Sequence, residues 1–521
     1  MSASQQFRKS ISRRSFLKLL GVSASASVLA ACVPIAPAGE AGTATEVQPA
    51  AEAPPEAGLV TIRYAGLEFM GARVEEFLQP WLEEKGYTLE RGSFGQQELE
   101  DKIMQSVATN TYLADVFQFP SNARADVIGA GALMPVPEHV LLDINFDDVL
   151  PNIVSTLSWE GKVYALPYDG DIHYYGFRKD LLANQEIMDR FASQYGYRLT
   201  PEDGANTWEE WRNIGEFFTG WDWNENDEED DFGLAVMNKR GDTAWWGFHS
   251  RATAYAKHPD DPGYFLDTQT GEARINNPGF VKALTEWVEE SQKWAPPGGT
   301  NSTYGDSANA VTGGRAVQTY SWDIVTQSTS PETSVVQGKM GFNILPGSKE
   351  VYNSQTGAWD SFPNISHAPF HAFGGWVIAV SAMVDKDKLN PVWEMVTHLA
   401  SPESGMWFVT NLTGASPYRF SQFEAVDEFA NGPLQLGEEA AKDYLDAAKR
   451  TLDHPNAVTD LAIPGWVQYR DALELAVAKA MAEELPPQDA LDEAKAAFDE
   501  ISERMGGLPE QAALYRLTLG L

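Results

Sequence analysis

Cysteine is almost absent from this 521-residue chain, which contains one, Cys32. A single cysteine cannot form an intrachain disulfide, and it cannot supply the several thiolates of a metal cluster. Basic residues are also scarce: 38 Lys and Arg stand against 74 Asp and Glu, a formal net charge of −36. This balance argues against nucleic acid and anionic lipid as partners. It is compatible with a neutral or cationic ligand, although a large acidic excess also simply keeps a protein soluble.

Long apolar runs are lacking as well. The segment from Phe16 to Ala30 is moderately apolar, but it is too short and too rich in Ser to span a bilayer as a stable helix. Basic residues precede it, namely Arg8, Lys9, Arg13 and Arg14. This order is typical of a signal peptide. The adjacent arginines within residues 12–18 (SRRSFLK) resemble a twin-arginine export signal.

The tetrapeptide at residues 29–32 (LAAC) resembles a bacterial lipobox. Small residues give a peptidase access, and the thiol of Cys32 is the nucleophile that takes the lipid; several acyl chains anchor a protein stably. Residues 33–58 are mostly Ala, Pro, Glu, Gly and Thr, which cannot bury enough surface to fold. We therefore predict a signal peptide over residues 1–31, then a lipidated Cys32 and flexible linker over residues 32–58, with the lipid as the only membrane attachment.

Catalytic signatures are missing too. The chain has no G-x-G-x-x-G, no P-loop, no H-E-x-x-H and no Cys cluster, and its eight His and one Cys do not indicate a redox cofactor site. We predict a protein that is not an enzyme and needs no cofactor. A secreted glycoside hydrolase remains an alternative. Such an enzyme needs two carboxylates at a defined separation, and 74 acidic residues neither identify nor exclude such a pair.

Aromatic residues, in contrast, are plentiful, with 16 Trp and 18 Tyr. These side chains offer flat apolar faces and a polar tip, which match the C–H faces and hydroxyl edges of sugars. Many of them must also belong to the core. The composition favours a carbohydrate ligand. A cationic solute such as a polyamine is the alternative, because acidic and aromatic side chains also bind ammonium groups through cation–π contacts.

The pattern along the chain predicts α/β architecture. Strands are expected at 60–65 and 115–119, with helices at 73–85 and 97–109 between them. The roughly 460 residues after the linker exceed one ordinary core and indicate two lobes.

Further element boundaries follow from capping residues. Thr207 and Glu210 form a capping box, and Asn277-Pro278 and Asn390-Pro391 are each expected to open a helix. A buried strand is expected at 375–381, and helices over 464–506, interrupted at Pro486-Pro487.

A specific resemblance begins at residues 158–182, which read SWEGKVYALPYDGDIHYYGFRKDLL. This segment resembles the family-1 extracellular solute-binding proteins of ABC importers, which include maltodextrin- and polyol-binding proteins, although Arg178 replaces the commoner Asn. Other segments resemble the family's motifs in the same order. They are 207–211 (TWEEW), 277–278 (NP), 313–317 (GGRAV), 322–323 (WD), 340–347 (MGFNILPG), 374–376 (GGW), 401–403 (SPE) and 414–417 (GASP).

The resemblance covers about residues 59–510 and implies a two-lobe periplasmic-binding-protein fold of type II. Lobe one would comprise residues 59–169 plus 372–413, and lobe two residues 170–371 plus 414–521. The chain would cross between lobes near 169–171, 368–373 and 413–417. The family resemblance further implies a monomer that closes on its ligand by hinge bending and delivers it to the transmembrane subunits of an ABC permease.

Candidate ligand-binding residues lie at and near these crossings. Trp376 resembles the Trp that stacks on sugars in relatives, and Asp169 and Asp171 would accept hydrogen bonds from hydroxyl groups. The remaining candidates are polar or aromatic residues, namely Tyr174, Tyr175, Trp322, Asp323, Trp245, Trp246, Trp466, Tyr469, Glu68 and Asn122. Trp245 and Trp246 follow a glycine turn, and we expect their rings to be exposed.

One acidic segment has part of the pattern of a calcium loop. Asp222, Asn224, Asn226 and Asp230 follow the spacing D-x-N-x-N-x-x-x-D, in which alternate oxygens converge on a hard cation. The glycine usual at position six is Asp227, and the glutamate usual at position twelve is Gly233. The pattern therefore predicts either a structural calcium site or a solvated acidic loop.

Overall fold

The structure, a computed structural model, describes residues 59–227, 231–322, 324–411 and 415–521. The predicted signal peptide, Cys32 and the linker lie outside the described residues, as do Asp230 and Asp323. Residues from Leu59 to Leu521 form one compact unit. Among the described helices, none carries an apolar run that would reach across a bilayer.

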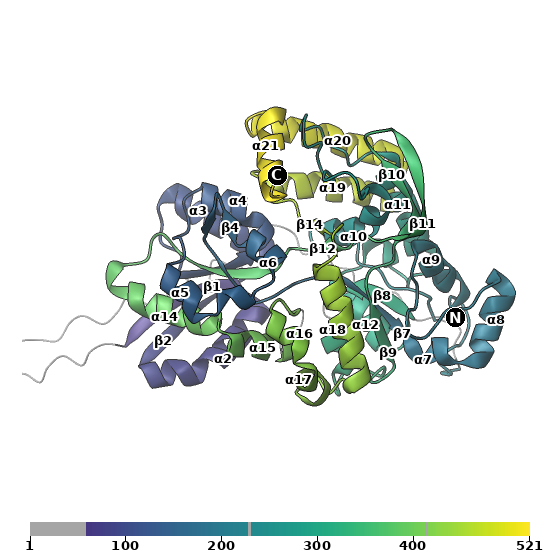
Figure 1. Cartoon of the computed structure of the whole chain (residues 1–521), viewed down its shortest axis with the longest axis horizontal. Coiled ribbons are helices and arrows are strands. Elements are labelled where there is room, and N and C mark those ends of the chain that lie inside the picture. The colour runs from purple at the N-terminus through teal and green to yellow at the C-terminus, as the bar shows by residue number, and fades with distance from the viewer. Residues whose placement is uncertain (1–58, 228–230, 323, 412–414) are drawn as a thin grey trace, which may run out of the picture. The chain divides into compact units, whose positions relative to one another are not determined.

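Two β-sheets organise this unit (Figure 1). The first has five strands in the order β2-β1-β3-β13-β6, and the second has three in the order β8-β7-β9. The strands of the first sheet are β2 (Tyr87–Phe94), β1 (Val60–Leu67), β3 (Val116–Pro120), β13 (Trp376–Val380) and β6 (Leu166–Pro167). Those of the second are β8 (Gln318–Ser321), β7 (Tyr174–Arg178) and β9 (Met340–Asn343).

The first sheet begins with the predicted strand–helix alternation. β1 pairs in parallel with β2 and β3, and the helices α2 (Glu68–Lys85) and α3 (Gln96–Thr109) make the connections. β13, far away in sequence, then adds antiparallel to β3, with Trp376 opposite Pro120. Further helices follow in this part of the chain or return to it: α4 (Arg124–Gly129), α5 (Glu138–Asp143), α6 (Pro151–Thr156), α14 (Leu389–Leu399) and α15 (Pro402–Asn411).

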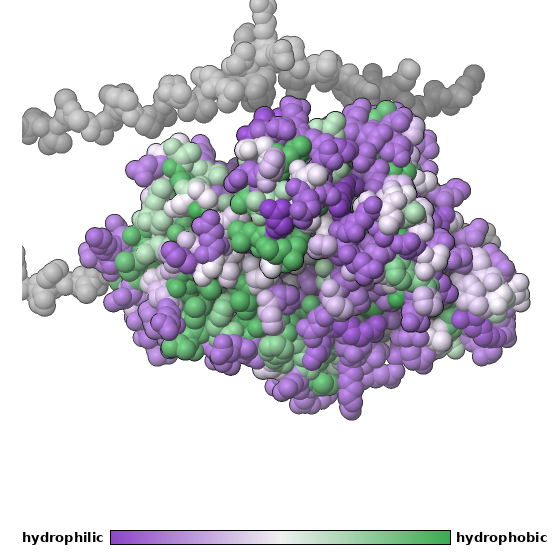
Figure 2. Space-filling view, turned by 45° about the horizontal axis from the view of Figure 1, so that its top comes forward, coloured by the Kyte–Doolittle hydropathy of each residue, from purple (hydrophilic) through white to green (hydrophobic). Residues whose placement is uncertain are grey.

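Most of the remaining helices follow β7 in the sequence. They are α7 (Lys179–Ala183), α8 (Gln185–Tyr195), α9 (Trp208–Phe217), α10 (Ala244–Ala256), α11 (Pro278–Lys293), α12 (Tyr304–Thr312), α13 (Ile324–Thr329), α16 (Phe420–Glu424), α17 (Val426–Asn431), α18 (Glu438–Leu452), α19 (Trp466–Met481), α20 (Pro487–Arg504) and α21 (Leu508–Thr518). Short strand pairs complete the fold: β4 (Ser158–Trp159) with β5 (Lys162–Val163), β10 (Ser348–Asn353) with β11 (Ala358–Ser366), and β12 (Phe370–His371) with β14 (Val458–Thr459). In the face shown in Figure 2, hydrophilic residues predominate and apolar residues form smaller patches.

Capping explains where several helices begin. The Oγ1 atom of Thr207 accepts a hydrogen bond from the backbone N–H of Glu210, and the Glu210 carboxylate accepts one from that of Thr207, so the predicted capping box is confirmed. Asn277 caps α11 as predicted. The prediction for Asn390 is wrong, because α14 begins at Leu389 after a 3₁₀ turn over Lys386–Lys388 that sets the start upstream.

The chain leaves the first sheet between β6 and β7 and returns to it between β9 and β13. These two connections meet the segment after α15. The backbone N–H of Gly170 donates to the carbonyl oxygen of Ser416 at 2.8 Å, and the N–H of Ser416 donates to Oδ1 of Asp169 at 2.9 Å. Gly375 lies against the same place. The residue boundaries of the two lobes stay a prediction.

Gly375 provides a test of this close approach. Its φ is +99°, and a Cβ atom there would lie 2.4 Å from the carbonyl oxygen of Asp169. Because strain and overlap add, we expect Gly375→Ala to lower the free energy of unfolding by about 3 kcal/mol in urea titrations. Gly131→Ala is the control, since its φ is +75° and no heavy atom lies within 4 Å. It should cost about 1–2 kcal/mol from strain alone. An equal cost for both would contradict the close approach.

Candidate ligand-binding site

Four aromatic side chains meet beside the contact between the connecting segments, and we call them the aromatic group: Trp246, Trp322, Phe373 and Trp376. The ring of Phe373 lies 4.1 Å from that of Trp246, 5.3 Å from Trp322 and 5.5 Å from Trp376, between centroids. All four are at most 7% exposed. Trp246 is on α10, Trp322 directly follows β8, and Trp376 begins β13, so strands of both sheets contribute to the group.

Phe373 is a residue that the sequence analysis missed. Its φ is +63°, and Gly374 and Gly375 follow with φ of +72° and +99°. A bulky side chain is rare in this conformation, and such strain clusters at functional sites. The carbonyl oxygen of Phe373 accepts a 2.6 Å hydrogen bond from Oγ of Ser121 in the segment after β3. The signal in the sequence was an aromatic residue directly before a glycine pair in a predicted crossing.

Asp460 is a second missed residue. Its carboxylate accepts four hydrogen bonds, each 2.8 Å long, from Nε1 of Trp245, Nε1 of Trp246, Nδ2 of Asn122 and the backbone N–H of Leu461. Burial raises the pKa of Asp460, while these donors oppose the rise. Its only signal in the sequence was one acid in a mostly apolar segment.

The expected exposure of Trp245 and Trp246 is wrong. Both are buried, at 0% and 1% exposure. Every residue of α10 is buried, because helices and strands contact this helix on several sides. The glycine turn at Gly241 precedes the helix but does not bring its first turn to the surface.

The first connecting segment supplies polar groups. Asp169 and Asp171 are 1% and 3% exposed, and Oδ1 of Asp169 accepts hydrogen bonds from the backbone N–H groups of Ser416 and Asp171, both at 2.9 Å. Burial raises the pKa of Asp169 against these two donors. His173 follows, with Nδ1 2.6 Å from Oγ of Ser250 and its ring 4.0 Å from Trp322. Burial lowers the pKa of His173 well below its usual range, so its imidazole is neutral.

Several buried polar atoms around the aromatic group have no hydrogen-bond partner among the residues that the structure describes. They are Asn122 Oδ1, Asp169 Oδ2, His173 Nε2, Trp322 Nε1, Ser416 Oγ and Trp466 Nε1. Buried polar groups are nearly always paired, so these atoms call for partners. The set contains both acceptors and donors. A molecule with several hydroxyl groups satisfies both kinds, because each hydroxyl donates one hydrogen bond and accepts others.

Other predicted residues have partners of a structural kind. The hydroxyl of Tyr175 donates to Gln318 at 2.8 Å, that of Tyr469 lies 2.8 Å from Oγ of Ser502, and the ring of Tyr174 packs on Tyr444. The ring of Trp466 lies 5.5 Å from Trp245 and 6.1 Å from Trp246.

Glu68 is exposed at the first residue of α2. Asp323 lies outside the described residues. Ligand contacts by these residues stay predictions.

The calcium-like loop is bonded internally. The carboxylate of Asp222 accepts hydrogen bonds from the backbone N–H groups of Asn226 and Asp227, and Oδ1 of Asn224 accepts a second bond from Asn226, all at 3.0 Å. Asp230 lies outside the described residues. Among the residues with described positions, no three His, Cys, Asp or Glu side chains are grouped to hold a metal. A calcium ion here stays a prediction.

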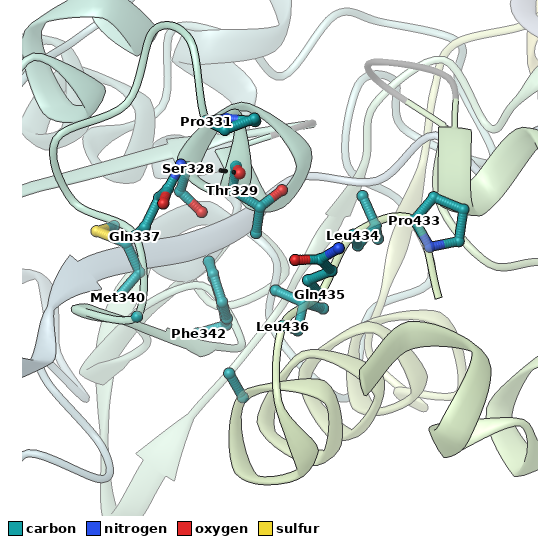
Figure 3. A pocket seen from close by; sticks show the side chains of 12 residues that line it. Ser328, Thr329, Pro331, Gln337, Met340, Phe342, Pro433, Leu434, Gln435 and Leu436 are labelled. Carbon is teal, nitrogen blue, oxygen red and sulfur yellow. Dashed lines mark hydrogen bonds between the residues drawn. The ribbon is translucent and has the colours of Figure 1, made fainter. Parts of the chain in front are cut away.

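A cavity of about 170 Å³ lies away from the aromatic group, between α13, β9 and the loop before α18. Figure 3 shows Phe342 on the strand side, facing Leu434 and Leu436 on the loop. None of the predicted site residues lines this cavity.

Comparison with known proteins identifies the protein family. The profile of the bacterial extracellular solute-binding protein family matches residues 72–421, more than half of the chain. The chain therefore belongs to this family. Its members are ligand-binding transport proteins, and the family places the protein outside the cytoplasm. The predicted family is confirmed.

Individual relatives are more distant. The mannitol-binding protein of Pseudomonas aeruginosa is 24% identical over 226 residues, and the match spans 42% of this chain and 45% of the relative's length.

Two solved structures show the same two-lobe α/β fold, which confirms the predicted fold class. A solute-binding protein from Agrobacterium radiobacter in complex with ribitol has a TM-score of 0.65 at 20% identity and covers 84% of this chain and 97% of its own. A solute-binding protein from Agrobacterium vitis with bound D-mannitol has a TM-score of 0.64 at 17% identity, and the match covers 86% of this chain and 99% of that protein.

The raised pKa of Asp169 predicts a pH-dependent effect of Asp169→Asn. The folded state holds the carboxyl proton more tightly than the unfolded chain, whose pKa is about 3.9. The resulting stabilisation is complete below that value and is lost as pH rises through the folded pKa. Asparagine mimics the neutral form at every pH. Relative to the unsubstituted protein, we therefore expect the variant's free energy of unfolding in urea to improve from pH 5 to pH 8. A variant that becomes relatively less stable over this range would contradict the raised pKa.

Proposed function

We propose that this protein is the solute-binding component of an ABC importer and captures a carbohydrate, either a sugar or a polyol, between its two lobes for delivery to a membrane permease. The observation that carries the proposal is the aromatic group surrounded by buried polar atoms without partners among the described residues. Flat rings match the C–H faces of a carbohydrate, and the polar atoms match its hydroxyl groups. The ligands named for the relatives, mannitol and ribitol, support the same chemistry.

A cationic solute fits this site less well. An ammonium group buried beside aromatic rings is best held by a free carboxylate. The carboxylate of Asp460, which lies beside Trp246, already accepts four hydrogen bonds. Asp169, another carboxylate beside the connecting segments, has a raised pKa and so resists carrying the negative charge that a cation needs. His173 and Trp322 add neutral groups.

Hydrolysis is also disfavoured. A glycoside hydrolase needs one carboxyl group free to protonate a leaving group and a second free to act as nucleophile or base. Each oxygen of Asp460 accepts two hydrogen bonds, so this carboxylate is not free for either role, and Asp169, whose Oδ1 is held by two backbone N–H groups, offers only Oδ2. Binding without turnover is the function that this arrangement supports.

The N-terminal motif supplies the location within this proposal. We infer that the signal peptide is removed at Cys32 and that the lipidated cysteine tethers the protein to the outer face of the membrane. A tether raises the effective concentration of the loaded protein near its permease. The mass of the mature N-terminal peptide tests this, since an unmodified Cys32 would exclude the anchor.

A ligand panel tests the function. A ligand present at a hundred times its dissociation constant stabilises a folded protein by about 2.7 kcal/mol. We expect the melting temperature to rise by several degrees with at least one of D-mannitol, ribitol, D-tagatose and maltose, and to stay unchanged with putrescine and spermidine. A rise with a polyamine and none with any carbohydrate would overturn the carbohydrate proposal. Sustained hydrolysis of a bound oligosaccharide would overturn the assignment as a binding protein.

A further inference from the structure

The carboxylate of Asp460 is the point on which two adjacent indoles converge. Trp245 and Trp246 are neighbours on α10, so their side chains leave the helix in directions about 100° apart. Both Nε1 atoms nevertheless donate to Asp460, Trp245 to Oδ1 and Trp246 to Oδ2, each at 2.8 Å. One side chain thereby fixes the orientation of two ring planes. Trp246 is the ring that contacts Phe373 most closely in the aromatic group.

Asp460 also joins the site to the first sheet. Nδ2 of Asn122, two residues after β3, donates to Oδ2 of Asp460 at 2.8 Å. A second contact lies nearby, where Oδ1 of Asp126 accepts a 3.0 Å hydrogen bond from the backbone N–H of Gly465 at the start of α19. The segment from Ser121 to Asp126 thus contacts the start of α19, which carries Trp466, and is linked to Trp245 and Trp246 through Asp460.

The same segment is tied to the return connection. Ser121 donates from its backbone N–H to the carbonyl oxygen of Gly375 at 3.1 Å and from Oγ to that of Phe373 at 2.6 Å. A chain of contacts therefore links Asp460 to Phe373. Asn122 bonds to Asp460, and the preceding residue, Ser121, bonds to Phe373. Movement of the first sheet relative to Asp460 would stretch the bond between Asn122 and Asp460, which is a direct side-chain bond between them.

We propose that Asp460 is the positioning residue of this site, which orients the indoles of Trp245 and Trp246 and, through Asn122, makes closure of the first lobe depend on that orientation. The inference rests on the proposed function, since it names how the same site is preorganised. Asp460 need not touch the ligand, because all four of its bonds go to protein donors.

The chemistry of the residue explains why an aspartate stands here. Four donors converge, and only an ionised carboxylate presents two oxygens that each accept two bonds. Asparagine would replace one of the two carboxylate oxygens by an NH₂ group. The two donors that this oxygen now accepts would then be buried without an acceptor. The guanidinium of Arg124 is a nearby positive charge that favours the ionised form: burial lowers the pKa of Arg124 to about 10, and the charge of Asp460 opposes that fall.

Three substitutions separate the two roles in the purified full chain. Asp460→Asn disturbs both roles, Asn122→Ala removes only the bond from Asn122 to Asp460, and Trp246→Phe removes one donor while keeping an aromatic ring. Asn213→Ala is the matched control, since its Nδ2 donates a 2.9 Å bond to Tyr197 away from the site. Nuclear magnetic resonance of protein labelled with ¹⁵N-tryptophan gives one indole N–H signal for each tryptophan, and these signals report ring orientation without ligand. Trp245→Phe and Trp246→Phe assign the two signals of interest. Small-angle scattering reports closure.

We expect Asp460→Asn to shift the indole signals of both Trp245 and Trp246 and to weaken carbohydrate binding at least tenfold by calorimetry. Asn122→Ala should leave both indole signals in place, enlarge the radius of gyration relative to Asn213→Ala, and weaken binding about threefold to tenfold because the closed state is less populated. If Asp460→Asn does not fold, Asn122→Ala and Trp246→Phe still carry the test.

Two results would overturn the proposal: unchanged indole signals in Asp460→Asn, or a radius of gyration in Asn122→Ala equal to that of Asn213→Ala. Failure of the proposed function is a separate outcome. If no carbohydrate binds the unsubstituted protein, the indole signals and scattering, both measured without ligand, still decide whether Asp460 positions the rings and the first lobe.

Discussion

The contact between Asp169, Gly170 and Ser416 is the constraint on which the site depends. One carboxylate oxygen and one backbone N–H hold two connecting segments together, and Gly375 of a third segment approaches the same backbone so closely that no side chain fits. Because the segments between the sheets meet here, residues that lie up to 247 positions apart in the sequence end within hydrogen-bond distance. The aromatic group forms beside this contact: Phe373 and Trp376 come from the return connection and the start of β13, and Trp246 and Trp322 come from α10 and the end of β8.

The surroundings then combine opposite kinds of chemistry. The rings of Phe373 and the three tryptophans form an apolar surface. Asp460 accepts a hydrogen bond from Trp246 and another from Asn122, which follows a strand of the first sheet. Burial raises the pKa of Asp169 and lowers that of His173, which shifts these two groups toward their neutral forms. A site of flat rings and mostly neutral polar atoms suits a ligand that is itself neutral and hydroxylated.

Local signals in the sequence predicted the local structure well. The capping residues Thr207 and Asn277 start helices through their own side chains, so their effect is readable over four residues. Trp322 and Trp376 belong to the predicted family motifs, and both lie in the aromatic group, while their contact with a ligand stays a prediction. Asp460 and Phe373 were not found, because both depend on neighbours more than 100 positions away: Asp460 matters through Trp245 and Asn122, and Phe373 through Trp246. The burial of α10 was not found because it depends on packing against α11, α19, β10 and β12.

A crystal structure with the carbohydrate that stabilises the protein most tests the central claim directly. The account predicts that the ligand's C–H face lies against the ring of Trp322, Phe373 or Trp376, and that its hydroxyl groups lie within 3.2 Å of Oδ2 of Asp169 or Nε2 of His173, a separation typical of hydrogen bonds. A carbohydrate bound instead in the cavity beside Phe342 and Leu434, with the aromatic group untouched, would contradict it.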